Sequence, residues 1–125
     1  MSREIDDLAK AFFEAIEGDQ LEKVRELYAP DVEVWHNVTD HAQSREENLK
    51  LLANFAGRVS KRRYEVLSRE FFPGGFVQRH RLHGELGSGQ PLALHACLVV
   101  HVADGRISRL YEYLDSAAVQ PAFAS

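Results

Sequence analysis

A glutamate lies among apolar residues near the end of the chain. In the strand-like run from residue 107 to 115, alternation places Glu112 on the same face as Leu110 and Leu114. A buried carboxylate must find a partner, take up a proton, or line a cavity where a ligand or water satisfies it, because an unpaired buried charge is costly. We therefore predict that Glu112 faces a pocket and acts as a general acid or base. The alternative is a structural carboxylate paired with an arginine at the rim of the sheet.

Two histidines have similar surroundings in other strand-like runs. His36 shares a face with Val34, and His80 shares the apolar face of residues 76–82 with Gln78. Histidine exchanges protons near neutral pH, and a nearby carboxylate can orient it. We predict that both histidines join the glutamate as catalytic residues and that Gln78 helps to bind a ligand oxygen. The alternative is that they are hydrogen-bonded core residues.

The same three side chains also make a possible metal set, because imidazole and carboxylate are common zinc and iron ligands. They come from separate predicted strands, however, without the local spacing of a helical metal motif. The run at residues 87–89 is typical of a hairpin turn and not of a phosphate loop, and no serine has a nucleophile-elbow motif around it. We therefore predict proton-transfer chemistry without a metal or other cofactor.

Length and composition limit the classes of protein and partner. The chain of 125 residues is 45% hydrophobic and 27% charged, which fits one globular domain spanning residues 1–125. No apolar run approaches the ~20 residues of a membrane span, and a net charge of −4 argues against nucleic-acid binding. The charged start at residues 1–7 lacks the apolar stretch of a signal peptide, so we expect a cytoplasmic protein. The single cysteine, Cys97, excludes an internal disulfide.

Helical spacing dominates the first half of the sequence. Apolar residues recur at helical intervals in two early stretches, residues 5–16 and 21–28. Ser44, with Glu47 three residues later, predicts a capping box at the start of a third helix. The basic run at residues 58–63 is expected at the end of that helix, where cations complement the helix dipole.

Strand patterns follow the third helix. Four alternating runs are separated by turn residues, at positions 64–72, 76–86, 92–103 and 106–114. Three hairpins between them predict an antiparallel meander. A further strand over residues 32–37 precedes a polar loop at residues 40–43. The separation of helices from strands indicates an α+β fold, in which a curved antiparallel sheet wraps against three helices from the N-terminal half.

This order of elements resembles the nuclear transport factor 2-like superfamily over nearly the whole chain. The resemblance is carried by residues 27–31 before the first strand and by the turn at residues 104–107 before the last. With residues 112–115, the chain is most similar to the SnoaL-like group, which is related to polyketide cyclases, ketosteroid isomerases and limonene-epoxide hydrolases. The resemblance implies a cone-shaped, cystatin-like fold with a small apolar molecule in the cone. That scaffold hosts isomerases, dehydratases, hydrolases, cyclases and proteins without catalysis.

The resemblance also implies roles for individual positions. His36 falls where the isomerases keep an aspartate base and the epoxide hydrolases an asparagine that helps to hold water. Glu112 falls where the hydrolases and cyclases keep an acid or base. Leu98 stands at the second acid of the isomerases, and Arg81 and His83 stand at the Arg-x-Asp pair of the hydrolases. Neither usual set is therefore reproduced, and we expect these last three residues to contact the ligand without repeating the known networks.

The strand from residue 76 to 86 then has two possible registers. Alternation turns Gln78 and His80 inward, whereas the likeness to the hydrolases turns Arg81 and His83 inward, and a one-residue slip exchanges the faces. We favour His80 inward, because the opposite face carries too much charge to line an interior unless a bulge intervenes.

The cone-shaped fold gives core residues a second possible role. Phe12, Tyr28 and Phe55 lie at predicted core positions, and in a cone they would form the apolar wall of a pocket. The outer face of the sheet, which carries Val99 and Tyr111, often forms a dimer interface in the resembling family. With the apolar tail at residues 116–125, it predicts a homodimer through the sheet face.

Two hypotheses for the function follow. The first is a small cytoplasmic enzyme that moves a proton on an apolar, oxygen-bearing molecule by isomerisation, cyclisation, dehydration or water addition. The second is a module of the same fold that binds a small ligand or dimerises without catalysis. The incomplete catalytic set favours the second hypothesis, and the convergence of titratable groups on apolar faces favours the first.

Overall fold

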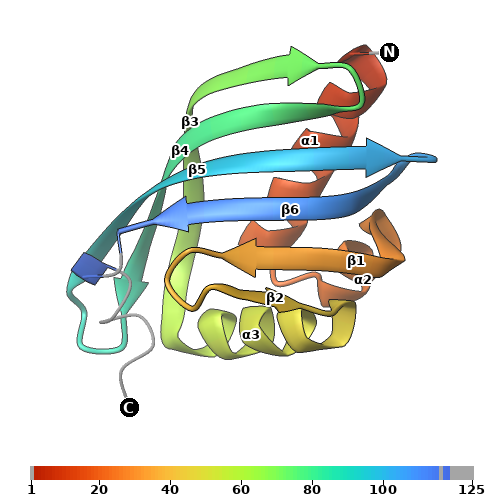
Figure 1. The fold of residues 1–125 in the computed structure, drawn as a ribbon. Coiled ribbons are helices and arrows are strands. Elements are labelled where there is room, and N and C mark those ends of the chain that lie inside the picture. The colour runs from red at the N-terminus through yellow and green to blue at the C-terminus, as the bar shows by residue number, and fades with distance from the viewer. Residues whose placement is uncertain (1, 116, 119–125) are drawn as a thin grey trace.

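The computed structural model describes residues 2–115 and 117–118 (Figure 1). The helices are α1 (Ser2–Glu17), α2 (Leu21–Leu27) and α3 (Arg45–Arg58), and the strands are β1 (Tyr28–His36), β2 (His41–Gln43), β3 (Val59–Phe72), β4 (Gly75–Leu86), β5 (Pro91–Ala103) and β6 (Arg106–Leu114). The predicted α+β fold is confirmed, with its helices in the N-terminal half. The apolar tail expected at residues 116–125 lies outside the described residues, apart from positions 117–118.

The strands form one curved sheet in the order β2-β1-β6-β5-β4-β3. Strands β3 to β6 make the predicted meander, because each pairs antiparallel with the next. Strand β1, however, lies parallel to β6. The sheet is therefore mixed, whereas we had expected it to be antiparallel throughout. Tight turns set direction only between strands that follow each other in the chain. The β1–β6 pair joins strands from opposite ends of the sequence and brings their last residues together.

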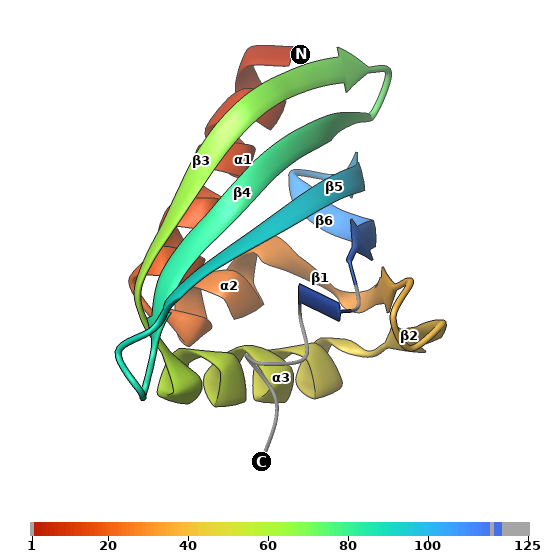
Figure 2. The same cartoon turned by 90° about the vertical axis from the view of Figure 1, so that its left-hand side faces the viewer.

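Two irregularities in β3 bend the sheet. The pairing of β3 with β4 shifts register between Ser60 and Arg63 and again between Val66 and Ser68. Lys61 lies inside the first shift with a φ of 55°, in the left-handed region that bulges also use. Bulges bend a strand and increase its twist. Figure 2 shows β3 and β4 curving along their length, from the end of α3 up to α1.

Three element boundaries differ from the expectation. Strand β3 begins at residue 59 and not at residue 64, because the first bulge breaks the alternation. Strand β2 occupies the expected polar loop; it has three residues and is mostly exposed, too little for an alternation signal. Strand β1 begins at Tyr28, directly after α2, so Ala29 and Pro30 lie in a strand.

The basic run after α3 supplies a cap for two helices. The guanidinium of Arg62 donates to the carbonyl oxygens of Ile16, Glu17, Ala56 and Val59. The first two carbonyls belong to the end of α1, Ala56 lies in the last turn of α3, and Val59 is the C-cap of α3. Terminal helix carbonyls lack partners within their helix, and a guanidinium carries several donors in a fixed fork. Arg62 therefore holds the ends of α1 and α3 close together.

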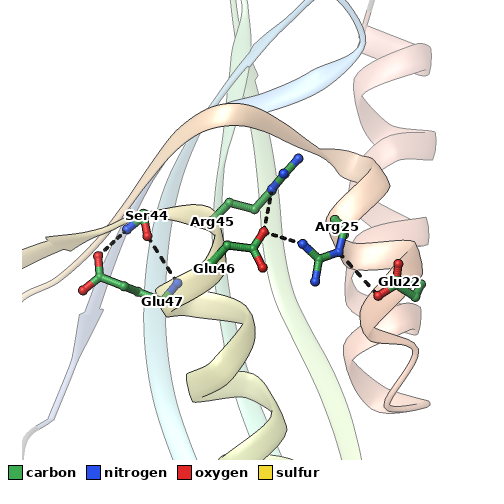
Figure 3. A network of polar contacts seen from close by, with 6 residues as sticks. All are labelled: Glu22, Arg25, Ser44, Arg45, Glu46 and Glu47. Atoms are coloured by element: carbon green, nitrogen blue, oxygen red, sulfur yellow. Dashed lines mark hydrogen bonds and ion pairs between the residues drawn. The ribbon is translucent and has the colours of Figure 1, made fainter.

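The start of α3 has the predicted capping box, which is confirmed. Ser44 Oγ accepts from the Glu47 amide at 3.3 Å, and Glu47 Oε1 accepts from the Ser44 amide at 2.9 Å. Figure 3 shows this cap beside an ion pair between Arg25 of α2 and Glu46 of α3. Both groups are at least partly exposed, so solvent screens the ion pair and it adds little to stability. The cap sets where α3 begins.

Buried apolar side chains form two clusters. The larger one joins the inner faces of α1 and of the central strands, and the smaller one contains Phe55, Val59, Leu82, Leu92 and Leu94 at the far end of the sheet. Partly buried Tyr64 packs against both clusters. A cavity lined by residues of both clusters lies between them and α3.

Candidate active site

A cavity of about 340 Å³ lies between α3 and the sheet, with lining residues from both core clusters. This volume is at the lower end of the range of small-molecule pockets. Most of the lining is apolar, including Phe55 and Leu52 of α3. The polar lining residues are His36, Thr39, Gln43, Tyr64, His80 and Glu112. The three residues predicted to be catalytic therefore lie on the wall of one cavity.

Glu112 and His36 form a direct pair on this wall. Parallel pairing places the two residues opposite each other in β6 and β1, and His36 Nε2 lies 2.9 Å from Glu112 Oε1. The side chains are 10% and 21% exposed, respectively. This distance is a hydrogen bond between a potential base and a potential acid. The pair is mostly enclosed yet open to the cavity, as a proton-transfer site requires.

Asn37 locks the strand ends that carry this pair. Its Nδ2 donates to the Leu114 carbonyl at 3.0 Å, and its Oδ1 accepts from the Leu114 amide at 2.8 Å. The backbone N–H of Asn37 also donates to the backbone carbonyl of Glu112 at 3.1 Å. This contact depends on the parallel pairing of strands that are distant in sequence, so the alternation within one strand does not reveal it. These bonds fix the register of β6 against β1 and so keep Glu112 opposite His36.

His80 approaches the cavity from β4. Its ring packs edge-on against Tyr64 and Phe13, with centroids 4.8 Å and 5.5 Å away. Burial lowers the pKa of His80; the charge of Glu112 opposes this effect and the charge of Arg69 adds to it. His80 is therefore a neutral imidazole near neutral pH.

Gln78 was predicted to bind the ligand, but it does not line the cavity. Its side chain is fully buried, its Nε2 lies 2.8 Å from His80 Nδ1, and its Oε1 accepts from Arg69 Nε at 2.8 Å. The amide is thus held between β3 and β4. It supports His80 from behind the cavity wall.

The predicted apolar wall is only partly correct. Phe55 lines the cavity, whereas Phe12, Tyr28 and Leu98 are buried in the larger core cluster and do not reach it. Burial, with the charge of Glu112 as a smaller contribution, raises the pKa of Tyr28 far above its usual range. Its hydroxyl donates to Asn48 Oδ1 at 2.7 Å. These three side chains pack within the cluster that α1 forms with the central strands, whereas the cavity lies against α3.

Arg81 and His83 lie on the outer face of β4, which corrects their assignment as ligand-binding residues. Arg81 contacts Glu65 at 3.5 Å, and His83 contacts the same carboxylate at 2.8 Å. Gln78 and His80 are buried on the opposite face. The register given by alternation is the one in the structure, because a strand side that carries this much charge stays in solvent.

Tyr64 and Gln43 are lining residues that sequence reasoning missed. Burial, together with the charge of Glu112, raises the pKa of Tyr64 well above its usual value, so its phenol remains a hydrogen-bond donor. Gln43 Oε1 accepts from Asn48 Nδ2 at 3.0 Å. Tyr64 lies between the two bulges of β3, and Gln43 lies in a strand that resembled a loop. No local pattern marks either residue as inward-facing.

Residues 9–110 match the model of the SnoaL-like domain family, which is well over half of the chain. The chain belongs to this family. No curated protein matches it in sequence. Solved structures with the same fold also resemble it. The resemblance to the SnoaL-like group that we inferred from the order of elements is therefore confirmed.

Three solved structures illustrate the likeness of this SnoaL-like domain. IdmH from Streptomyces antibioticus, a proposed polyketide cyclase, has a TM-score of 0.82 at 19% identity, covering 96% of this chain and 98% of IdmH. An LEH-like epoxide hydrolase from M. tuberculosis has a TM-score of 0.80 at 18% identity, covering 96% and 89%. An NTF2-like protein of unknown function from Burkholderia pseudomallei has a TM-score of 0.83 at 15% identity, covering 98% of both chains. At these identities the likeness establishes the fold alone.

The described part of this SnoaL-like domain contains no group of three or more histidine, cysteine or acidic side chains that could hold a metal ion. His36 and Glu112 meet, but His80 does not complete a ligand set with them. Among the described residues, no helix is long and apolar enough to cross a membrane. The cavity does offer an acid/base pair from β1 and β6 and hydrogen-bond donors from β3 and β4.

Proposed function

We propose that this SnoaL-like domain catalyses proton transfer on an apolar, oxygen-bearing small molecule bound in the cavity between α3 and the sheet. The observation that carries the proposal is the 2.9 Å contact between His36 Nε2 and Glu112 Oε1 on the wall of a mainly apolar cavity. An exposed ion pair elsewhere on the surface would carry no such meaning. Here both groups can reach a ligand that is shielded from water.

Each group of the pair has a distinct role. The Glu112 carboxylate accepts a proton from the substrate and returns it at another atom. His36 donates its Nε2–H to the carboxylate, which orients the oxygen and keeps the pair hydrogen-bonded. Proton transfer by one well-placed group contributes roughly 10²–10⁴-fold to a rate. The reaction class is isomerisation, cyclisation, dehydration or water addition.

Two cavity residues from β3 and β4 support the same proposal. Tyr64 and His80 both line the cavity, Tyr64 partly buried and His80 buried, and their rings contact each other. Hydrogen-bond donors in such a place stabilise negative charge that develops on a substrate oxygen. A ligand with one oxygen toward these two residues and a proton toward Glu112 would use both sets of groups.

The experiment that tests the proposal is proton exchange at the carbon next to a ketone. 2-Tetralone and related bicyclic ketones are incubated in deuterated water with the protein, and deuterium uptake is followed by proton NMR. We expect Glu112→Gln, which keeps the shape of the side chain, to lower the protein-catalysed rate by about 10²-fold or more. Exchange at the wild-type rate in this variant would contradict the role of Glu112.

The chain offers a matched control for this experiment. His41 and Glu47 form a second histidine–glutamate pair, 3.4 Å apart, in which both side chains are more than half exposed. Glu47→Gln makes the same chemical change outside the cavity and retains a capping box, since glutamine also serves at that position. We expect this control variant to exchange at the wild-type rate.

The second candidate function is binding of a small ligand without catalysis. The observation in its favour is Leu98, which stands where the related isomerases keep a second acid and is 3% exposed in the core. Saturable binding of the ketones, seen as shifts of cavity resonances, without any protein-catalysed exchange would favour this second function over the first.

A further inference from the structure

A chain of side-chain hydrogen bonds leads from the surface of α1 to His80. Asp6 Oδ1 accepts from Arg69 Nη1 at 2.7 Å, and Asp6 also pairs with Lys10 at 3.1 Å. Arg69 Nε then donates to Gln78 Oε1 at 2.8 Å, and Gln78 Nε2 lies 2.8 Å from His80 Nδ1. The links are progressively more enclosed: Asp6 is partly exposed, Arg69 is mostly buried, and Gln78 is completely buried.

The chemistry of the two amide neighbours determines the direction of every bond in this chain. A guanidinium has donors only, so the atom of Gln78 that faces Arg69 must be its oxygen. The amide nitrogen, which also only donates, must then face His80 Nδ1. A ring nitrogen that accepts a hydrogen bond carries no proton. His80 therefore holds its single proton on Nε2.

The protonated nitrogen faces the cavity. His80 Nε2 makes no hydrogen bond with the described residues, although His80 as a residue is 2% exposed. Within the described part, no side-chain nitrogen or oxygen is both fully enclosed and without a partner. Because His80 lines the cavity, Nε2 opens into that space.

We propose that Arg69 and Gln78 are positioning residues that hold His80 as the neutral Nε2–H tautomer, so that the cavity has a fixed hydrogen-bond donor for an acceptor oxygen of the ligand. The proposal deepens the proposed function. It rests on that function for one point only, that the oxygen bound by this donor belongs to a substrate. In this arrangement His80 does not carry protons between atoms. Glu112 moves the proton, and His80 binds the oxygen on which charge develops.

Protonation of His80 is disfavoured by geometry as well as by burial. An imidazolium would direct a second N–H from Nδ1 at the amide N–H of Gln78, and two donors would then face each other. The charged or titratable groups that act on the ring are Arg69 and Tyr64 from β3 and Glu112 from β6. The lowered pKa of His80 agrees with this geometry, since Glu112 alone would favour the charged form.

The direct test is ¹⁵N NMR of the histidine rings in the full-length protein labelled with ¹⁵N-histidine, without any ligand. We expect His80 Nδ1 to resonate as an unprotonated nitrogen and Nε2 as a protonated one at about pH 7.5. A wild-type spectrum with the proton on Nδ1, or with protons on both ring nitrogens at this pH, would overturn the proposal.

The matched variants are Gln78→Glu and Gln90→Glu. The carboxylate introduced by Gln78→Glu accepts from both Arg69 and His80, so we expect the proton of His80 to move to Nδ1 or the ring to become an imidazolium. Gln90→Glu makes the same change in the exposed turn between β4 and β5, and His80 should keep the wild-type spectrum. An unchanged His80 spectrum in folded Gln78→Glu also contradicts the proposal.

The readout separates this proposal from the proposed function. The ring spectrum needs no substrate, so it stands whatever the outcome of the exchange assay with Glu112→Gln. If Gln78→Glu fails to fold, the wild-type spectrum still decides the tautomer. A correct tautomer in a protein that catalyses no proton exchange would leave His80 as a binding donor and reject only the catalytic role of Glu112.

Discussion

Glu112 meets His36 because β6 and β1 run parallel with these two residues directly opposite each other. Their side chains are joined at 2.9 Å, and Asn37 fastens the same strand ends with three further hydrogen bonds. Backbone pairing therefore holds the two residues directly opposite each other, and their side chains need only adopt the rotamers that meet. This rigidity is what a proton-transfer site needs, since small displacements of reacting groups lower rates strongly.

Substitution of His36 should lower the rate of proton exchange while leaving Glu112 in the cavity. We expect His36→Phe to lower protein-catalysed ketone exchange by about 10²-fold, because the carboxylate of Glu112 loses the bond that orients it. The measurement is deuterium uptake with 2-tetralone at saturating and limiting ketone. His41→Phe, in the exposed histidine–glutamate pair, is the control and should leave the rate unchanged. Equal rates for both variants would show that His36 has no part in the reaction.

His80 should make stability depend on pH in a defined direction. Its pKa is lowered in the folded protein, chiefly by burial. Below the ordinary histidine pKa of about 6.5 the unfolded chain therefore binds more protons at this site, and the free energy of unfolding falls as pH falls, by at most about 1.4 kcal/mol per unit. Urea unfolding at about pH 7.5 and pH 5.5 should show a smaller loss for His80→Gln than for the wild type.

The control for this pH effect is His41→Gln, which should keep the wild-type dependence because His41 is largely exposed. If His80→Gln loses as much stability on acidification as the wild type does, His80 is not the buried neutral group that the structure contains.

Gly75 is required by the close approach of β4 to its neighbours. A methyl group there would lie 2.2 Å from the carbonyl oxygen of Val100 and 2.5 Å from the ring of Phe72. Overpacking of this kind typically costs about 1–3 kcal/mol, so Gly75→Ala should lower the urea midpoint by a corresponding amount. Gly87→Ala places a methyl group with nothing within 4 Å and should change stability by less than about 0.5 kcal/mol. Similar midpoints for the two variants would contradict this account.

The outer face of the sheet is our predicted dimer interface. Trp35 packs against Tyr111 and Tyr113 there, with ring centroids 6.2 Å and 5.2 Å away, and Tyr113 is 48% exposed. Light scattering should give about 28 kDa, twice the 14.2 kDa of one chain, and Tyr113→Asp should shift the protein toward a monomer. Leu67→Asp alters an exposed apolar residue on β3 and should not. A wild-type protein of 14.2 kDa at micromolar concentration would reject the interface.

The faces of the long strands could be read from alternation. Gln78 and His80 were expected inward and are buried, whereas Arg81 and His83, assigned to the ligand through the family likeness, lie outside against Glu65. Alternation predicts this correctly because neighbouring side chains in a strand always take opposite faces. A likeness at low identity does not preserve the register of a strand to one residue.

Alternation did not predict which residues of a buried face line the cavity. Gln78 and His80 occupy equivalent inward positions in the sequence, yet only His80 reaches the cavity, because Arg69 of the neighbouring strand binds the side-chain amide of Gln78. Tyr64 reaches the cavity from a strand segment whose alternation is broken by bulges on both sides. These roles depend on which segments meet across the sheet.

The sequence by itself determined the helices, the capping box at Ser44, the hairpins of the meander and the inward faces that carry Glu112, His36 and His80. Each of these follows from interactions among residues a few positions apart, which leave periodic patterns in the chain. Only the tertiary structure decided that β1 runs parallel to β6, and hence that Glu112 and His36 touch. Direction and register between strands far apart in sequence are set by the packing of the whole sheet against the helices, and no local pattern encodes them.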